Sequence, residues 1–206
     1  MTEQDHLDVL HQGRDVWNQW RQEHHAIQPD FSGEDFKGAH LSRVNLAGAL
    51  LNGADFSGAD LRESLLIRAD LSEAILSRAN LVRADLQGAN LTAAILSDAN
   101  LSDAILSNAV LSDADLTGAI LTGAEVTGTD FSGVDFSDAD LSGIDFSKAN
   151  THGARLGKAY FSRRSDTLPD ESYQQSLRTD TQRQKRAGFD AEDLDKRAHE
   201  DWANDE

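Results

Sequence analysis

A large apolar residue returns at every fifth position of the chain from Phe31 to Phe161. Of these 27 positions, 25 hold Leu or Phe, and the exceptions are Val126 and Thr151. A small residue, most often Ala, stands two positions earlier, and Asp or Asn usually lies between the two. Ser, Thr or another polar residue follows, and then frequently Gly. The spacing is constant from residue 29 to 163, so the pattern contains no inserted loop.

A period of five matches neither an α-helix nor a β-strand, whose periods are about 3.6 and 2 residues. It predicts that each unit turns one corner, with polar residues and Gly at the corner, and directs the same two side chains inward. One unit cannot bury its own Leu, so stacked units must form the core. The expected core includes Leu61, Leu66, Leu71, Leu76, Leu81, Leu86, Leu91, Leu96 and Leu101.

The unit Ala-(Asp/Asn)-(Leu/Phe)-(Ser/Thr)-Gly, as in residues 54–58, resembles the pentapeptide-repeat family. The resemblance implies an all-β solenoid, a right-handed quadrilateral parallel β-helix in which each unit is one side and four units make a coil. It also implies that the large residue and the preceding Ala face inward while the other three positions face solvent. The 27 units then give about seven coils and a rod roughly 33 Å long, at about 4.8 Å per coil.

Two features of the core vary along this repeat. Phe gathers near its ends, at Phe31, Phe36, Phe56, Phe131, Phe136, Phe146 and Phe161. Thr151 places a hydroxyl where an apolar side chain belongs, and we expect it to be the weak point of the last coils.

The chain divides into residues 1–28, the repeat at 29–163 and residues 164–206. We expect a helix over residues 3–25 that caps the first coil, because solenoids need covered ends. Its apolar face holds Leu7, Leu10, Trp17 and Trp20. The run Gly13–Arg21 resembles the N-terminal helical cap of some members of the family. The alternative for its aromatic residues is a stripe that binds a partner.

Residues 164–206 form a polar segment in which 190–203 could be a last helix. Asp190 would be its N-cap, and Leu194, Ala198 and Trp202 would share a face. This helix would cap the last coil, pair with a second subunit, or take no fixed structure. A monomer and a homodimer through this segment are therefore both open.

Composition narrows the environment of the protein. There is no Cys, no apolar run of the roughly 18–20 residues that span a bilayer, and no Lys or Arg in Met1–Leu10 to suggest a signal peptide. We expect a soluble, cytoplasmic protein. The net charge of −17 disfavours direct binding of nucleic acid or a membrane and favours a partner with a basic surface. The acid could equally serve only to keep an edge-rich protein soluble.

The chain carries no recognisable catalytic or metal-binding motif. Its seven His residues form no metal-binding spacing, and no nucleophile elbow, phosphate-binding loop or dinucleotide fingerprint is present. Carboxylates on a convex rod also lack the closed pocket that perturbs a pKa. We expect no enzyme activity, no cofactor and no metal.

The outer positions suggest a protein-binding scaffold as the first hypothesis. Ile75 and Ile95 are twenty residues apart and should stack on one side, giving a small apolar strip beside acid. These side chains could instead be individually tolerated on the surface.

DNA mimicry is the alternative, because some members of the family imitate a duplex and bind type II topoisomerases such as DNA gyrase. Between Arg83 and Lys148 there are eleven acidic residues and no basic one. Four-unit folding places Asp98, Asp115, Asp135 and Asp138 on one side. The absence of an inserted loop and the expected N-terminal helix both count against mimicry. A third hypothesis is a purely structural spacer.

Overall fold

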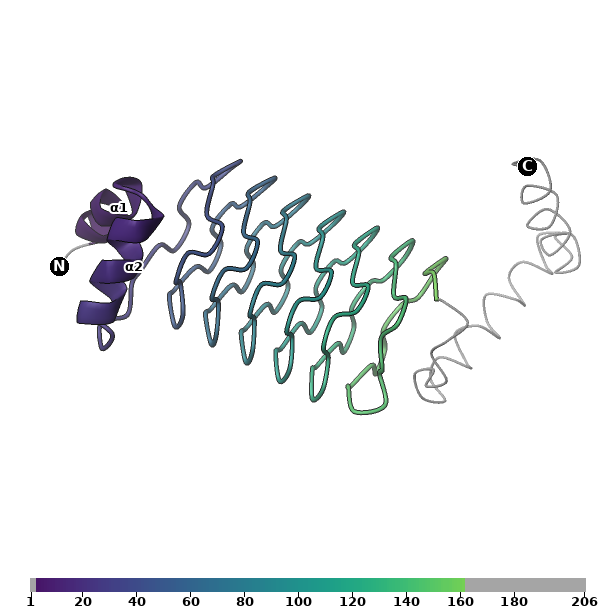
Figure 1. Cartoon of the computed structure of the whole chain (residues 1–206). Helices are drawn as coiled ribbons and strands as arrows, with labels where there is room; N and C mark the ends of the chain where they lie inside the picture. Colours follow the sequence, from purple (N-terminus) through teal and green to yellow (C-terminus); the bar gives the residue numbers. More distant parts are fainter. Residues whose placement is uncertain (1–2, 162–206) are drawn as a thin grey trace, which may run out of the picture. The chain divides into compact units, whose positions relative to one another are not determined.

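The computed structural model describes residues 3–161 (Figure 1). Two short helices, α1 (Glu3–His11) and α2 (Arg14–Glu23), precede the repeat. The expected single helix over residues 3–25 is therefore wrong. Gly13 separates the two helices and has a φ of 109°, a backbone conformation that residues other than Gly rarely adopt. The predicted helix at 190–203 lies outside the described residues.

The repeat forms a stack of coils whose sides are held by single parallel β-bridges. Each bridge joins residues twenty positions apart, from Asp30 with Leu50 to Asp140 with Tyr160. The bridged residue is the one just before the large apolar residue, so each five-residue unit contributes one side. Four units therefore complete one turn of the chain, and equivalent sides lie in register above one another (Figure 1). We number the coils from residue 29 in steps of twenty.

Main-chain hydrogen bonds connect neighbouring coils and close each corner. The N–H of Leu46 donates to the carbonyl of Leu65 at 2.8 Å, and the N–H of Leu65 donates back to Val44 at 2.9 Å. Within the corner, the N–H of Ala49 donates to Leu46 at 3.1 Å, as in a β-turn. This pattern recurs along the repeat and satisfies main-chain groups that the stack would otherwise bury without partners.

The second central residue of nearly every corner turn adopts a positive φ. Twelve of these positions hold Gly, but twelve others hold residues such as Arg78, Ala93 and Asp98, with φ between 54° and 60°. The left-handed conformation costs a non-glycine residue about 1–2 kcal/mol. The stacking of coils must therefore impose this conformation on the middle of the repeat.

The interior is filled as the repeat predicts. The nine Leu residues expected in the core, from Leu61 to Leu101, are all fully buried. Each contributes about 1.5–3 kcal/mol of apolar transfer free energy. Thr151 also points inward and is 7% exposed, so a hydroxyl does enter the last coils.

The hydrogen-bond register shifts by one residue at a single corner between the fifth and sixth coils, and the usual spacing returns at Phe131, which donates to Asn150. Gly123 donates to the carbonyl nineteen positions on, Ser142, but Gly128 donates to Lys148, twenty positions on. Ile144 lies in the sixth coil and is buried at an inward position that is usually Ala. Figure 1 shows a wider corner in the green part of the stack. The five-residue spacing is constant in the sequence, but the hydrogen bonds between coils are not the same at every corner.

Neither α1 nor α2, which are the helices of the described part, has the length and apolar character to cross a membrane.

Candidate binding surface

One side of the solenoid carries the six residues predicted to bind a partner. We call it the isoleucine side and define it by the bridged positions Asp35, Asp55, Ile75, Ile95, Asp115, Asp135 and Arg155. Ile75 is bridged to Ile95, and Ile95 to Asp115, so the two isoleucines stack directly as the spacing predicts. Asp98 and Asp138 lie three residues after Ile95 and Asp135, at the corner that ends this side. The structure thus brings all six residues onto one side or its edge.

The isoleucine pair is partly open to solvent. Ile95 is 39% exposed, and Ile75 is half-buried. The opposite side carries two comparable residues, Leu65 at 40% and Ile105 at 36%, but Asp85 separates them. Ile75 and Ile95 therefore form an uninterrupted apolar step, which the opposite side lacks at those positions.

The acidic residues of this side also shape the turns that follow them. The Thr117 amide donates to a carboxylate oxygen of Asp115 at 2.9 Å. The amide and hydroxyl of Ser137 donate to Asp135 at 2.9 and 2.6 Å. Such side-chain-to-backbone bonds two residues on stabilise a turn, so these carboxylates have a local structural role. The surface reading of Asp115 and Asp135 missed this role, although the Asp-x-(Ser/Thr) spacing signals it.

Cations neutralise part of the acid at both ends of the isoleucine side. The guanidinium of Arg155 lies 2.9 Å from Asp135, and the ammonium of Lys37 lies 3.0 Å from Asp55. Partial burial acts to raise the pKa of Asp135, but bonds from Ser137 and Arg155 outweigh it and hold the pKa below its ordinary value. Bonds from Ser57, with a smaller contribution from Lys37, lower the pKa of Asp55. Both carboxyls therefore stay ionised at neutral pH.

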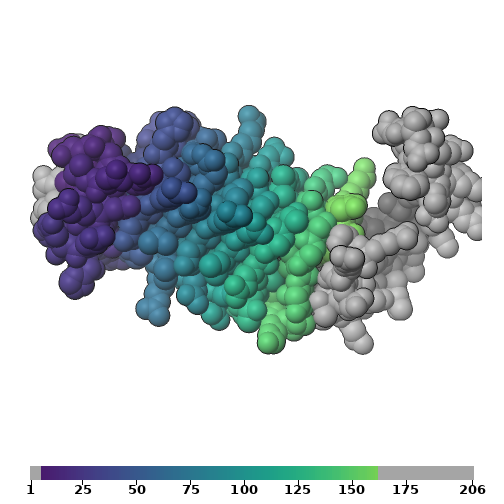
Figure 2. Space-filling view, in the orientation of Figure 1, coloured from purple at the N-terminus to yellow at the C-terminus, as the bar shows by residue number. Residues whose placement is uncertain are grey.

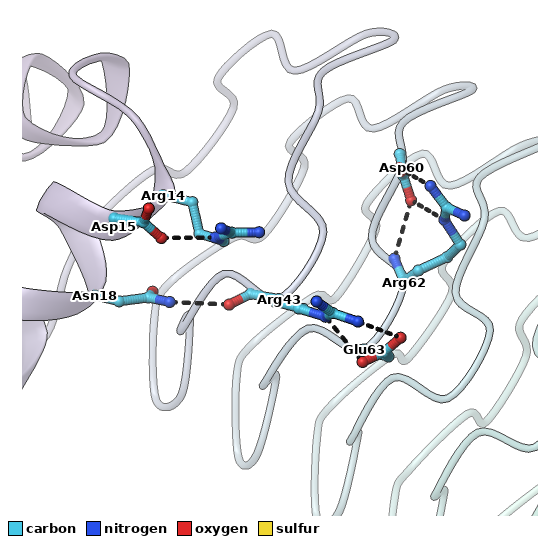
Figure 3. A network of polar contacts seen from close by, with 7 residues as sticks. All are labelled: Arg14, Asp15, Asn18, Arg43, Asp60, Arg62 and Glu63. Carbon is cyan, nitrogen blue, oxygen red and sulfur yellow. Dashed lines mark hydrogen bonds and ion pairs between the residues drawn. The ribbon is translucent and has the colours of Figure 1, made fainter.

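A polar network lies on the corner nearest the helices (Figure 3). Arg43 binds Glu63 at 2.9 Å, and Arg62 binds Asp60 at 2.7 Å. Together with Ser42, the side chains of Arg43, Arg62 and Glu63 line a cavity of about 230 Å³. The bond from Arg43 lowers the pKa of Glu63, which makes this carboxylate a weak general base. The network has the character of a solvated set of ion pairs rather than a reaction centre.

No group of three or more His, Cys, Asp or Glu residues within residues 3–161 has the arrangement to hold a metal ion. The acidic ladder is spread along the stack rather than converging on one point.

The N-terminal helices contact the fourth side of the first coil. The indole of Trp17 donates to the Asn45 carbonyl at 2.8 Å, and Arg21 donates to the Ala47 carbonyl at 2.8 Å. Asn18 accepts from the Asn45 amide at 2.8 Å. Side chains of α2 thus bind main-chain groups of the kind that a preceding coil binds elsewhere. Figure 2 shows the helices lying directly against the first coils.

The apolar residues predicted for this helical segment face the same junction. Trp17 is fully buried, and Trp20 stacks on it with ring centres 5.1 Å apart. Leu7 and Leu10 of α1 are also buried. Sequence reasoning missed Asn18 and Arg21, because their partners lie in a part of the chain that the helical pattern does not reveal.

Comparisons with known proteins identify the repeat. The family profile for pentapeptide repeats matches eight copies within residues 30–163. The solved structure of HetL, a pentapeptide repeat protein involved in heterocyst differentiation regulation in the cyanobacterium Nostoc sp. strain PCC 7120, is 30% identical. That match covers 63% of this chain and 73% of HetL, with a TM-score of 0.35. A search of curated proteins finds no match.

Two further solved structures match part of this chain. A pentapeptide repeat protein from the Arabidopsis thaliana thylakoid lumen is 36% identical over 53% of this chain and 69% of its own, with a TM-score of 0.35. Full-length QnrB1, a plasmid-mediated fluoroquinolone resistance protein, is 20% identical over 72% of this chain and 94% of its own, with a TM-score of 0.31.

Proposed function

Because the chain belongs to the pentapeptide-repeat family of right-handed β-helix solenoids, we propose that it is a non-catalytic scaffold that binds a protein partner through its isoleucine side. The observation that carries the proposal is the direct stacking of the part-exposed Ile75 and Ile95, with Asp115 continuing the ladder. Exposed apolar residues rimmed by charge are typical of protein–protein contact sites.

The charge around the isoleucine pair favours a partner with basic residues. Asp98 and Asp138 are exposed at the edge of this side, and no ion pair within residues 3–161 involves Asp98, Asp115 or Asp138. A partner that places Lys or Arg beside an apolar contact would complement this surface, while a partner with only acidic residues at that contact would be repelled.

Affinity capture with matched variants tests this function. We expect Ile75→Lys/Ile95→Lys to lose a partner that the native protein and Leu65→Lys/Ile105→Lys both retain. The control pair lies on the opposite side and has similar exposure. Loss of the partner by both variants, or by neither, would contradict the assignment to the isoleucine side, provided that circular dichroism shows intact folding.

DNA mimicry is a second candidate, favoured by the eleven acidic residues between Arg83 and Lys148. The Arg155–Asp135 pair weighs against it, because a cation sits within the strip that would imitate phosphates. A gyrase supercoiling assay tests the idea with Asp98→Lys/Asp138→Lys, since Asp115 and Asp135 also hold turns. Inhibition by the native protein that this variant loses would place mimicry first, and no inhibition would remove it.

We also propose that α1 and α2 cap the first coil. Their side chains replace the donors and acceptors of a preceding coil, and an uncovered β-helix end exposes pairing groups that promote aggregation. A spacer with no partner remains the third hypothesis, and it predicts that no variant on any side changes capture.

A further inference from the structure

The isoleucine side of the third and fourth coils has a feature that a basic partner alone does not explain. Residues 75–78 read Ile-Leu-Ser-Arg, and residues 95–98 read Ile-Leu-Ser-Asp. The two segments are bridged and occupy equivalent places in neighbouring coils, so they differ in one corner position, Arg78 against Asp98. The patch is therefore identical above and below its midline except for a reversal of charge.

We infer that the isoleucine side binds a second copy of this chain, antiparallel and face to face. This inference rests on the proposed binding role of that side and names one occupant for it. A twofold axis in the plane of contact, midway between the third and fourth coils, sets Ile75 against the partner's Ile95. The same rotation sets Arg78 against the partner's Asp98 twice, as a self-complementary contact requires.

The two charged residues are available for this contact. Both are exposed, and both hold a left-handed corner, with φ of 57° and 58°. No ion pair within the described residues joins them, in contrast to Arg43 and Glu63, which have the same spacing and pair at 2.9 Å. The Asp98 carboxylate leans toward the next coil, where an oxygen lies 2.5 Å from the position that a side chain on Gly118 would take. Asp98 is thus turned away from Arg78 of its own chain.

The flanking residues are compatible with the antiparallel arrangement. The rotation brings Asp115 opposite the partner's Asp55 and Asp135 opposite the partner's Asp35. Within each chain Lys37 lies 3.0 Å from Asp55, and Arg155 lies 2.9 Å from Asp135. A cation is therefore supplied where the carboxylates meet. A parallel arrangement would set each coil against itself and would not oppose Arg78 to Asp98.

The contact area implies weak association. A single side is roughly 10 Å wide and about 30 Å long over six coils, at about 3.3 Å per residue and 4.8 Å per coil. This footprint is well below the ~800 Å² per partner of a stable interface. We therefore expect a dimer that forms at high protein concentration and weakens as salt screens the two charge pairs.

Sedimentation velocity of the full chain across a concentration series, at low and high salt, tests the inference. The native protein should dimerise, and Arg78→Asp and Asp98→Arg should each weaken dimerisation at least tenfold, because each places like charges in both pairs. Mixing these two variants should restore association as a heterodimer, since every pair is then complementary. The double exchange Arg78→Asp/Asp98→Arg should restore a homodimer.

Other results would overturn the inference. These are a native protein that stays monomeric, single variants that dimerise like the native protein, or a mixture of the two that does not associate. Arg is already accommodated at left-handed corners such as Arg68 and Arg83, so Asp98→Arg should fold, and circular dichroism checks this. A monomeric native protein that still captures a different protein through Ile75 and Ile95 would leave the proposed function standing and reject only the second copy.

Discussion

The indole N–H of Trp17 donates a 2.8 Å hydrogen bond to the main-chain carbonyl of Asn45, at the place where a coil below would otherwise donate. One coil further on, the equivalent carbonyl of Leu65 accepts from the N–H of Leu46 at 2.8 Å. A helical side chain therefore stands in for a main-chain donor. This substitution explains how a helix can end a β stack with which it shares no backbone geometry.

The first prediction concerns this junction. Trp17→Phe keeps an aromatic ring but leaves the Asn45 carbonyl without its donor. We expect it to lower the free energy of unfolding by about 1–3 kcal/mol, measured by urea denaturation. Val16→Ala is the control, because Val16 is 45% exposed beside Trp17 and should change stability by less than about 0.5 kcal/mol. Equal effects of the two substitutions would show that the bond contributes nothing.

The second prediction uses two corner positions in one column. Ala93 and Gly53 are forty residues apart, with φ of 55° and 66°. Ala93→Gly should raise the free energy of unfolding by about 0.5–1 kcal/mol, because relief of left-handed strain exceeds the entropy that Gly loses on folding. Gly53→Ala should lower it by a similar amount, although nothing lies within 4 Å of the new side chain. Shifts of the urea midpoint in the same direction for both would contradict the strain argument.

The third prediction concerns acid. The pKa of Asp135 is lower in the folded protein than its ordinary value, so the folded form binds this proton less readily than the unfolded chain does. The stabilisation is complete above the unfolded pKa of about 3.9 and is lost as pH falls through the folded pKa. Asp135→Asn keeps an oxygen for the turn, as Asn90 does for Thr92. It should be less stable at pH 7 and lose less stability below pH ~4. Parallel curves of urea midpoint against pH would refute the linkage.

The fourth prediction separates core from surface. Leu91→Ala should lower the free energy of unfolding by about 2–5 kcal/mol, because Leu91 is fully buried in the middle of the stack. Leu91→Arg should prevent folding of the repeat. Leu65→Ala, at a 40% exposed position, should stay within about 0.5 kcal/mol of the native protein in the same urea titration.

The periodic part of the structure could be predicted from the sequence because one rule governs every unit. The five-residue period assigns Leu91 to the core and stacks Ile75 on Ile95, and both placements agree with the structure. Because the period is fixed, the number of units in a coil is the only long-range information that is needed to predict which residues stack on one another.

What the period does not encode could not be predicted in this way. Gly13 breaks the N-terminal helix, and the binding of Arg21 to the Ala47 carbonyl depends on how α2 sits against the first coil. The register shift at Gly128 is confined to one corner, and the constant five-residue spacing of the sequence does not reveal it. The ion pair between Arg155 and Asp135 could have been predicted, because the twenty-residue spacing places these two residues on neighbouring coils.

The twenty-residue coil also makes direction in space a simple function of position in the chain. Removal of one five-residue unit between Ile95 and Asp115 would keep every remaining Leu at an inward position, because each unit forms one whole side of a coil. It would nevertheless turn Asp115 and all that follows through a quarter of a revolution, so that the acid no longer continued the isoleucine ladder. Removal of four units, which is one whole coil, would shorten the rod but leave each remaining residue on its original side. Gain or loss of single five-residue units can therefore change which residues share a side of the solenoid, without any substitution of a side chain.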